Sequence, residues 1–333
     1  DPSKAKLWLY NLHYLDELNT QGADNRVAVL NQLIDRWMDD NPAPQGNGWE
    51  PYPLSLRLVN LVKWHMRQHY QGAKLCNSIQ QQANALSQHI EYHIMANHLF
   101  ANAKALVFAG AALMDGDRFL QHGLKILDTE IPEQFLADGG HFERSPMYHA
   151  TLLWDMCDLL NLVKISELSE LQSRAVDWSK VVERGLAWLA HLSHPDAEIA
   201  FFNDSTLGIA PCYADLCRYA QMLGIKPSTP NTSAVTHLRE SGYIAIASNP
   251  AVKLILDVGQ LGPDYQPGHA HADTLSFELS LFGQRVLVNS GISEYGTGAA
   301  RSYQRSTQAH NTLVVDGKNS CRMRPSSLIE LSI

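Results

Sequence analysis

The sequence predicts an α+β protein in which a long helical region precedes an antiparallel β region. Between residues 26 and 192, apolar residues recur at intervals of three and four, as in amphipathic helices. From about residue 236 the period changes to two, in short runs rich in β-branched residues. We therefore expect a helical domain over residues 1–232 and an antiparallel β domain over residues 233–333.

The helical region divides into segments bounded by Gly, Pro, Asp or Asn, an array of helical hairpins. Helices are expected at 26–38, 53–66, 75–94, 98–114, 118–131, 147–163 and 178–192.

The β region contains short alternating runs separated by turn residues. Strands are expected at 242–248, 252–259, 274–283, 284–291 and 311–317, after a linker at 227–235. An isolated sheet of this size exposes an apolar face, so the β domain is expected to be incomplete.

Composition narrows the function classes. A chain of 333 residues with 45% apolar residues can form two domains, and its net charge of −8 argues against a nucleic-acid-coating protein. No run of 18 apolar residues occurs, so no membrane span is expected. The first residues lack signal-peptide order, so we expect a periplasmic or secreted location only if a signal precedes residue 1. A cytoplasmic location stays open, and the oligomeric state is not predicted.

Three histidines of the β region form a candidate site. His269, His271 and Asp273 alternate at the head of an apolar run, and in a strand residues two apart share a face. His310 precedes another predicted strand and joins them only if the two strands are neighbours. The alternative is that the first two histidines are loop residues that hydrogen-bond to the backbone.

Two loops of the helical region are rich in polar side chains. Asn97 and His98 precede one predicted helix, while another loop carries a polar group within residues 141–149. Its members are His141, Glu143, Arg144, Tyr148 and His149. The alternatives are that Asn97 is a helix N-cap and Tyr148 a core aromatic.

Five blocks together resemble the heparinase II/III-like polysaccharide lyases, a group that includes alginate lyases. They are WEPYPLSLRLVNLVKW, NHLFANAKAL, DGGHFERSPMYH, GHAHADTLSFEL and HNTLVVDG, in that order along the chain. The resemblance implies an (α/α) toroid followed by an antiparallel β-sandwich, here cut short. It also implies β-elimination of an acidic, uronate-containing polysaccharide, heparin or heparan sulfate first, leaving 4,5-unsaturated ends.

The resemblance also implies the catalytic roles. Asn97 and His98 match the pair that neutralises the uronate carboxylate. Tyr148 matches the acid, which for some epimers is also the base, and His269 matches the alternative base. A free phenol has a pKa of about 10, so a tyrosine base needs nearby positive charge. Arg144 and His149 are the local candidates.

A metal site, usually zinc, is implied at His271 and His310. The third ligand in the family is an aspartate, and this chain has Asn289 at the matching position. A neutral amide is a weaker zinc ligand than a carboxylate. The site is therefore expected to be empty, weakly occupied, or completed by Asp273 or water.

The remaining candidates are substrate contacts. Aromatic and Arg side chains suit sugars and carboxylates, and the candidates are Trp49, Tyr52, Arg57, Arg144, Tyr303 and Arg305, with Tyr295 and Arg301 beside the last two. The alternatives are that the aromatics only pack and that the exposed Arg residues are solvated surface. The segment FNDST, with Asn203, is either a cleft loop or a turn.

Two functional interpretations from different classes follow. The first is an active lyase. The second is a non-catalytic or biosynthesis-associated polysaccharide-binding relative of a capsule or exopolysaccharide pathway, which the Asn289 departure favours. A hydrolase fits less well, because it needs two carboxylates flanking the bond and Glu143 alone does not provide them.

Overall fold

The computed structural model of the protein describes residues 4–70, 72–227, 234–248, 251–263, 265 and 267–322. The chain divides into two compact units, residues 1–130 and 131–333, which are treated separately below. The predicted domain boundary at 232/233 and most of the predicted linker lie outside the described residues.

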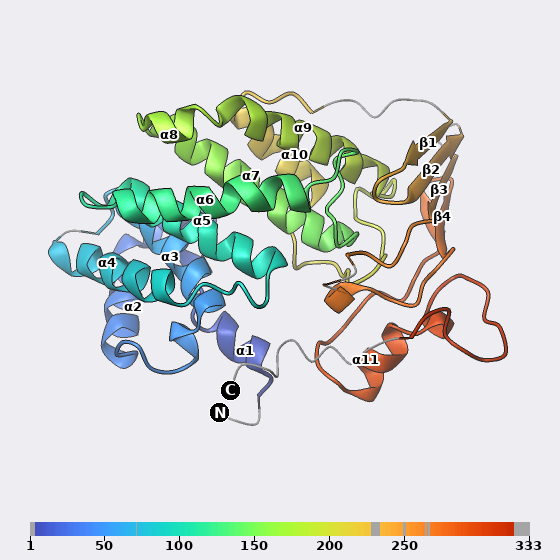
Figure 1. Cartoon of the computed structure of the whole chain (residues 1–333), viewed down its shortest axis with the longest axis horizontal. Coiled ribbons are helices and arrows are strands. Elements are labelled where there is room, and N and C mark those ends of the chain that lie inside the picture. Colours follow the sequence, from blue (N-terminus) through green and yellow to red (C-terminus); the bar gives the residue numbers. More distant parts are fainter. Residues whose placement is uncertain are drawn as a thin grey trace. The chain divides into compact units, whose positions relative to one another are not determined.

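The first unit is helical (Figure 1). Its helices are α1 (Lys6–Asn11), α2 (Val27–Asp40), α3 (Pro51–Met66), α4 (Ala73–Gln88), α5 (Ala96–Ala112) and the larger part of α6 (Asp117–Gln134). Helix α3 packs against both α4 and α5. Two glycines allow α6 to approach α5, because a Cβ on Gly110 would lie 2.4 Å from Leu120 N and one on Gly123 2.6 Å from Ala103 O.

Within its described residues, the second unit contains five further α-helices and the strands. The helices are α7 (Pro146–Ile165), α8 (Ser169–Gln172), α9 (Ala175–His191), α10 (Tyr213–Met222) and α11 (Ala299–Gln304). Helix α7 packs against α8, α9 and α10. It begins at Pro146, a favourable first helical residue, after the N-cap Ser145.

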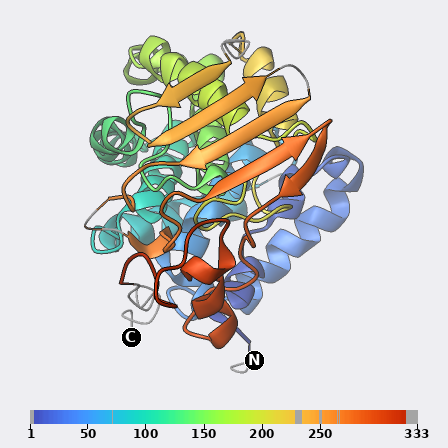
Figure 2. The ribbon, with the colours of Figure 1, turned by 90° about the vertical axis from the view of Figure 1, so that its right-hand side faces the viewer.

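The strands form one antiparallel sheet in sequence order. They are β1 (Val235–Leu238), β2 (Tyr243–Ser248), β3 (Val252–Asp257), β4 (Phe277–Leu281) and β5 (Gln284–Leu287). Figure 2 shows the sheet face-on, with the yellow-green helix α9 of the same unit behind it. On the helix side, Trp188 Nε1 donates to Ser241 Oγ at 2.8 Å and Lys253 Nζ to Ala190 O at 3.1 Å.

The two faces of the sheet differ in burial. Buried side chains alternate with half-buried apolar ones along β2, β3 and β4, as the period of two predicts. The half-buried set is Ile244, Ile246, Leu254, Leu256, Phe277, Leu279 and Leu281. The predicted apolar face is therefore present.

The predicted fold class is confirmed, helices first and an antiparallel sheet after them. The expected helix at 75–94 ends at Gln88, where His89 leaves the helical conformation and its Nδ1 bonds to Ala85 O at 3.0 Å. Residues 311–317 form no strand, and β5 stops at Leu287. The expectation of a strand at His269–Asp273 is wrong, because these residues lie in the connection between β3 and β4. None of the described helices is long and apolar enough to cross a membrane.

Candidate functional site

Asn97 lies in the first turn of α5, after a strained stretch of backbone. Met95 is the N-cap residue, with φ 63°, and Ala96 follows with φ 49°. Positive φ is unfavourable for such residues and is concentrated at functional sites. The alternative of Asn97 as the N-cap is wrong. Its partly exposed side-chain amide makes no hydrogen bond to any residue that the structure describes.

His98 is held by a buried carboxylate and a stacked ring. Its Nδ1 lies 3.1 Å from Glu91 Oε1, and the other Glu91 oxygen accepts from Asn102 Nδ2 at 3.0 Å. Glu91 is only 6% exposed. Tyr52 stacks on the His98 ring with centroids 4.3 Å apart and planes at 31°. The arrangement leaves Nε2 as the available ring nitrogen.

Trp49 and Arg57 lie in the same unit but play different parts. Trp49 lines a cavity of about 560 Å³ together with Trp37. Arg57 is 0% exposed, donates to Gln82 Oε1 at 3.0 Å and lies 3.8 Å from the centre of the Trp37 ring. The expected contact of Arg57 with sugar is therefore wrong, because the guanidinium lies in the core, where it can stack on an aromatic face.

Tyr148 and His269 lie together in the second unit. Their ring centroids are 3.9 Å apart, with planes at 31°. Tyr148 is near the start of α7, while His269 ends the short 3-10 helix Pro267–His269. The Tyr148 hydroxyl also lies 2.9 Å from that of Tyr295. The structure thus brings the predicted acid and the predicted alternative base into contact.

Ser145 ties the start of α7 to the loop that contains Asp204. Its Oγ accepts from Tyr148 N at 3.2 Å and donates to Asp204 O at 2.5 Å. Met147 N donates to Ser205 Oγ at 3.3 Å. These bonds fix the Tyr148 backbone relative to Asp204.

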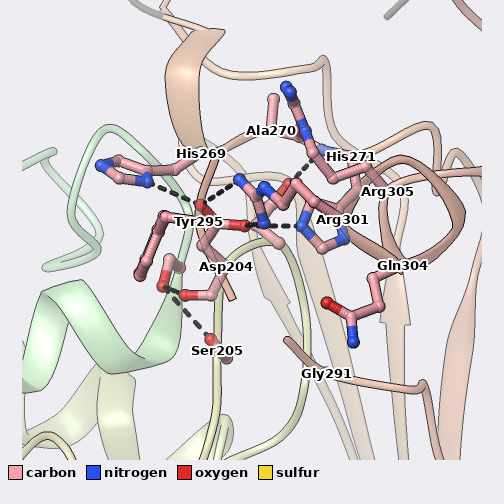
Figure 3. A network of polar contacts seen from close by, with 12 residues as sticks. Asp204, Ser205, His269, Ala270, His271, Gly291, Tyr295, Arg301, Gln304 and Arg305 are labelled. Atoms are coloured by element: carbon pink, nitrogen blue, oxygen red, sulfur yellow. Dashed lines mark hydrogen bonds and ion pairs between the residues drawn. The ribbon is translucent and has the colours of Figure 1, made fainter. Parts of the chain in front are cut away.

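Asp204 is the centre of a buried polar network (Figure 3). Its Oδ2 lies 2.7 Å from His269 Nδ1, and its Oδ1 lies 2.8 Å from His271 Nε2. Arg301 donates to both oxygens, with Nη2 2.7 Å from Oδ2. Asp204 and Arg301 are 0% and 2% exposed. Each carboxylate oxygen therefore accepts two hydrogen bonds.

The surroundings of Tyr148, His269 and Asp204 shift the pKa of each of the three side chains. Burial, Tyr295, Asp204 and Glu143 all raise the pKa of Tyr148 well above its usual value. Burial lowers the pKa of His269 and Arg301 adds to that, but Glu143 and Asp204 raise it, and the net direction is upward. Burial also raises the pKa of Asp204, but the hydrogen bonds from His269, His271 and Arg301 bring it below its usual value. Tyr148 is thereby kept protonated, as an acid requires.

The predicted sources of positive charge do not act on Tyr148. His149 is buried, bonds to Gly185 O at 2.9 Å, and burial lowers its pKa to about 4, so its ring is neutral at pH 7. Arg144 donates to Gln260 O, after strand β3. The structure therefore favours Tyr148 as acid over Tyr148 as base.

His271 and His310 form a pair of facing nitrogens. His310 Nδ1 lies 2.8 Å from Ser306 O, and His271 Nε2 lies 2.8 Å from the Asp204 carboxylate. Both acceptors require these nitrogens to carry hydrogen, so the facing pair, His271 Nδ1 and His310 Nε2, bears lone pairs in the neutral rings. The two lie 3.1 Å apart. Such a pair needs a proton or a cation between them, and outer partners of this kind are typical of metal-ligating histidines.

A third protein ligand is less well placed. Asn289 Oδ1 accepts from Asn311 N at 3.1 Å. Asp273, the other predicted candidate, is buried, and its Oδ2 has no hydrogen-bond partner among the described residues. Within those residues no group of three His, Cys, Asp or Glu side chains is arranged to hold a metal ion. The two imidazoles can hold a cation, but the described residues supply no third protein ligand in position.

Two other predicted substrate contacts differ from each other. Tyr303 is exposed. Arg305 is 6% exposed and donates to Ala270 O at 3.0 and 2.9 Å, so it clamps the loop that carries His269 and His271. The expectation that Arg305 contacts substrate is therefore wrong.

The segment FNDST contains the named candidate Asn203 and, next to it, Asp204, which sequence reasoning missed. Asn203 adopts φ 54° and accepts from His271 N at 3.1 Å, which makes it a loop clamp. Asp204, beside it, was given no role, and neither was Glu91. Their signal is weak in a single sequence, because a carboxylate next to a turn residue or inside a helical pattern is ordinary.

Comparisons with known proteins identify relatives of this chain. A family model described as the heparinase II/III N-terminus matches residues 26–228, and one described as heparinase II/III-like, C-terminal, matches residues 230–330. A heparin-sulfate lyase from Pedobacter heparinus is 29% identical over 272 residues, which cover 73% of this chain and 39% of that protein. The FtsZ-localized protein C of Caulobacter vibrioides is 25% identical over 317 residues, covering 93% of this chain and 52% of that protein.

Among solved structures, the crystal structure of heparinase III is similar, with a TM-score of 0.73 and 20% sequence identity. The match covers 92% of this chain and 53% of that one. This likeness concerns the fold. The chain spans about half the length, or less, of these relatives. With both family models matched in order along the chain, it belongs to the heparinase II/III-like family.

Proposed function

We propose that the protein is a polysaccharide lyase that cleaves a uronate-containing acidic polysaccharide of the heparin or heparan sulfate type by β-elimination. The observation that carries the proposal is the contact between Tyr148 and His269, an acid and a base within 3.9 Å between ring centroids. The names of curated relatives, three of them heparin-sulfate lyases, support the substrate class.

The proposed reaction uses the two side chains in sequence. His269 Nε2 takes the C5 proton, the C5–H electron pair forms the C4–C5 double bond, and the C4–O bond breaks. Tyr148 donates its hydroxyl proton to the leaving oxygen. Because Asp204 binds His269 Nδ1, Nε2 is the nitrogen that accepts the proton. Glu143 Oε1 lies 3.8 Å from Nε2 and stabilises the imidazolium that forms.

Asn97 and His98 are proposed to bind a uronate carboxylate of the polymer. The Asn97 amide and the His98 Nε2 are the available groups of their unit, and hydrogen bonds to a developing enolate are a large source of rate enhancement. Met95 and Ala96 hold the start of α5 in a strained backbone, which supports a functional role for the position.

The Trp49 cavity is proposed to bind an uncharged part of the polymer. Amide side chains line it, and its Lys74 is paired with Asp35 and Asp39 at 3.1 Å each. Little net positive charge is left for an anionic group. Replacing the exposed Asn77 and Gln81 together by Ala should raise KM and leave kcat nearly unchanged.

We also propose that His271 and His310 hold a structural zinc ion. When bound, it would cross-link the β3–β4 connection to the loop after α11, as structural zinc does. The facing nitrogens support the proposal, whereas the Asn289 amide in place of a carboxylate implies modest affinity.

A substrate screen tests the proposed activity. Heparin, heparan sulfate, hyaluronan, chondroitin, alginate and polyglucuronate are incubated with the protein, and the ultraviolet absorbance of the new C4–C5 double bond is followed. Product from a uronate polymer supports the proposal. Binding of a polymer without product would contradict it and favour the polysaccharide-binding alternative.

A further inference from the structure

We propose that Asp204 is a positioning residue for the elimination: it fixes His269 in the tautomer whose Nε2 can accept a proton. This inference rests on the proposed function and concerns a residue without direct contact to substrate. The hydrogen bonds around Asp204 carry the argument.

The first step is the tautomer. Asp204 Oδ2 lies 2.7 Å from His269 Nδ1, and an ionised carboxylate is an acceptor only, so Nδ1 carries the hydrogen. In the neutral ring Nε2 then bears the lone pair. Without Asp204 the two neutral tautomers compete, and the form with hydrogen on Nε2 cannot remove a proton from C5.

The second step is orientation. Arg301 binds both oxygens of Asp204, and His271 Nε2 approaches Oδ1 at 2.8 Å. A carboxylate with two donors on each oxygen cannot rotate without breaking several bonds. Its orientation is transmitted to the His269 ring, which Tyr148 covers on one side.

The third step is charge. Arg301 balances the charge of Asp204 within the buried cluster, at 2% and 0% exposure. Asp204 is therefore not an unpaired charge in the core. The same ion pair holds its carboxylate in the orientation that binds His269 Nδ1.

The unmodified protein tests the tautomer directly. With histidine labelled in ¹⁵N, long-range proton–nitrogen spectra distinguish the protonated ring nitrogen from the unprotonated one. We expect protonated Nδ1 and unprotonated Nε2 at His269. The reverse tautomer would overturn the proposal whatever the substrate screen shows, whereas a failed screen with the expected tautomer overturns the proposed reaction alone.

Substitution tests the consequence. In Asp204→Asn the side chain can donate as well as accept, so the tautomer of His269 becomes mixed. We expect kcat to fall roughly 10³- to 10⁴-fold with KM within about threefold, as when a triad carboxylate is replaced by an amide. Asp204→Glu keeps the carboxylate and should recover at least about tenfold over Asn.

Asp138→Asn is the matched control. Asp138 accepts from Ser241 N and Oγ in the same unit, at 2.8 Å each, and has no hydrogen bond to a histidine of the site. It should lower stability and leave both the tautomer and kcat nearly unchanged. An equal loss of kcat in the two variants, with the His269 tautomer unaltered in both, would show that Asp204 is merely structural.

Discussion

Each unit of the protein contains a tyrosine stacked on a histidine that is held by a buried carboxylate. In residues 1–130 the three are Tyr52, His98 and Glu91, and in residues 131–333 they are Tyr148, His269 and Asp204. The ring planes meet at 31° in both, and both carboxylates hold Nδ1. The same local design therefore occurs twice.

The difference lies around the carboxylate. Asp204 is bound by Arg301 and by a second histidine, His271, whereas Glu91 accepts from Asn102 and from no Arg or Lys that the structure describes. In addition, Tyr148 bonds to a second phenol. A stacked tyrosine and a carboxylate position an imidazole; the surrounding charges decide which chemistry it can perform.

Removal of one hydroxyl should separate the two triplets most clearly. Tyr148→Phe is expected to lower kcat two to four decades, about 3–5 kcal/mol, because it removes the proton donor and keeps the ring stacking. Tyr52→Phe should cost less than about tenfold and act mainly on KM. The measurement is steady-state kinetics on the best polymer of the screen, and equal losses would remove the distinction.

Replacing Asp204 and replacing Glu91 should lower the free energy of unfolding by different amounts. Asp204→Asn leaves Arg301 as a buried charge without its counter-ion, which typically costs about 3–5 kcal/mol. Glu91→Gln keeps an acceptor for Asn102 and leaves no described Arg or Lys without a counter-ion, so it should cost about 1–3 kcal/mol. Urea unfolding of both variants gives the two values. A larger loss for Glu91→Gln would contradict the role given to Arg301.

Acid should act on the second unit through His149. Its pKa is lowered to about 4 by burial, below the ordinary 6.5, so the folded state binds fewer protons than the unfolded state between these values. The contribution of His149 to the free energy of unfolding is complete above about pH 6.5. It is lost as the pH falls toward 4, and the whole loss is about 3 kcal/mol.

His149→Gln keeps a donor for Gly185 O and does not titrate, so the slope of stability against pH should decrease. The exposed His89 provides the control, because His89→Gln should leave the slope as it is. An unchanged slope in His149→Gln would show that other groups dominate acid unfolding.

Asn97→Asp tests the assignment of the first unit to the substrate carboxylate. The new charge would face the uronate and should lower kcat/KM roughly 10²-fold. Stability should change by less than about 1 kcal/mol, because Met95 is the cap and an acid in the first turn of a helix is favourable. Asn97→Ala, which removes the amide without adding charge, should lose less, and a similar loss in both variants would argue against a nearby carboxylate.

Asn289→Asp should have the smallest effect. A carboxylate in place of the amide should raise zinc retention about tenfold, equivalent to about 1.4 kcal/mol. Elemental analysis after dialysis against a chelator measures it, and thermal unfolding should change before turnover does. Immediate loss of turnover on chelation, restored by zinc with the fold intact, would mean a catalytic metal and overturn the assignment of Tyr148 and His269.

Much of the fold was predictable because the spacing of apolar residues along a short segment indicates which of its side chains are buried. The expected helices and an antiparallel sheet are present, with end errors at Gln88 and Leu287. Whole elements also differ, since the expected strand at 311–317 is absent and α10 and β1 were not expected. The candidate acid and base came from motif resemblance. The carboxylate that holds His269 was missed, because Asp204 lies 65 residues from His269 and no local pattern links the two.

Residue type also misled in particular places. Arg57 and Arg305 were expected to contact the polysaccharide, which requires exposure, as Arg usually has. Both are buried, one stacked on Trp37 and the other clamping the Ala270 carbonyl. His269 and His271 were expected to share a strand face. They reach the same carboxylate from a loop, because Asn203 and Arg305 shape that loop's backbone.

The double role of Ser145 has a mechanical consequence. One oxygen caps the helix that carries Tyr148 and also bonds the backbone carbonyl of Asp204, the residue that holds His269. A small displacement of α7 therefore carries the proton donor and the anchor of the base in the same direction. The separation between them should fluctuate less than the position of either relative to the rest of the unit. A polymer sliding past the site would then meet an acid and a base that respond to its movement as one body.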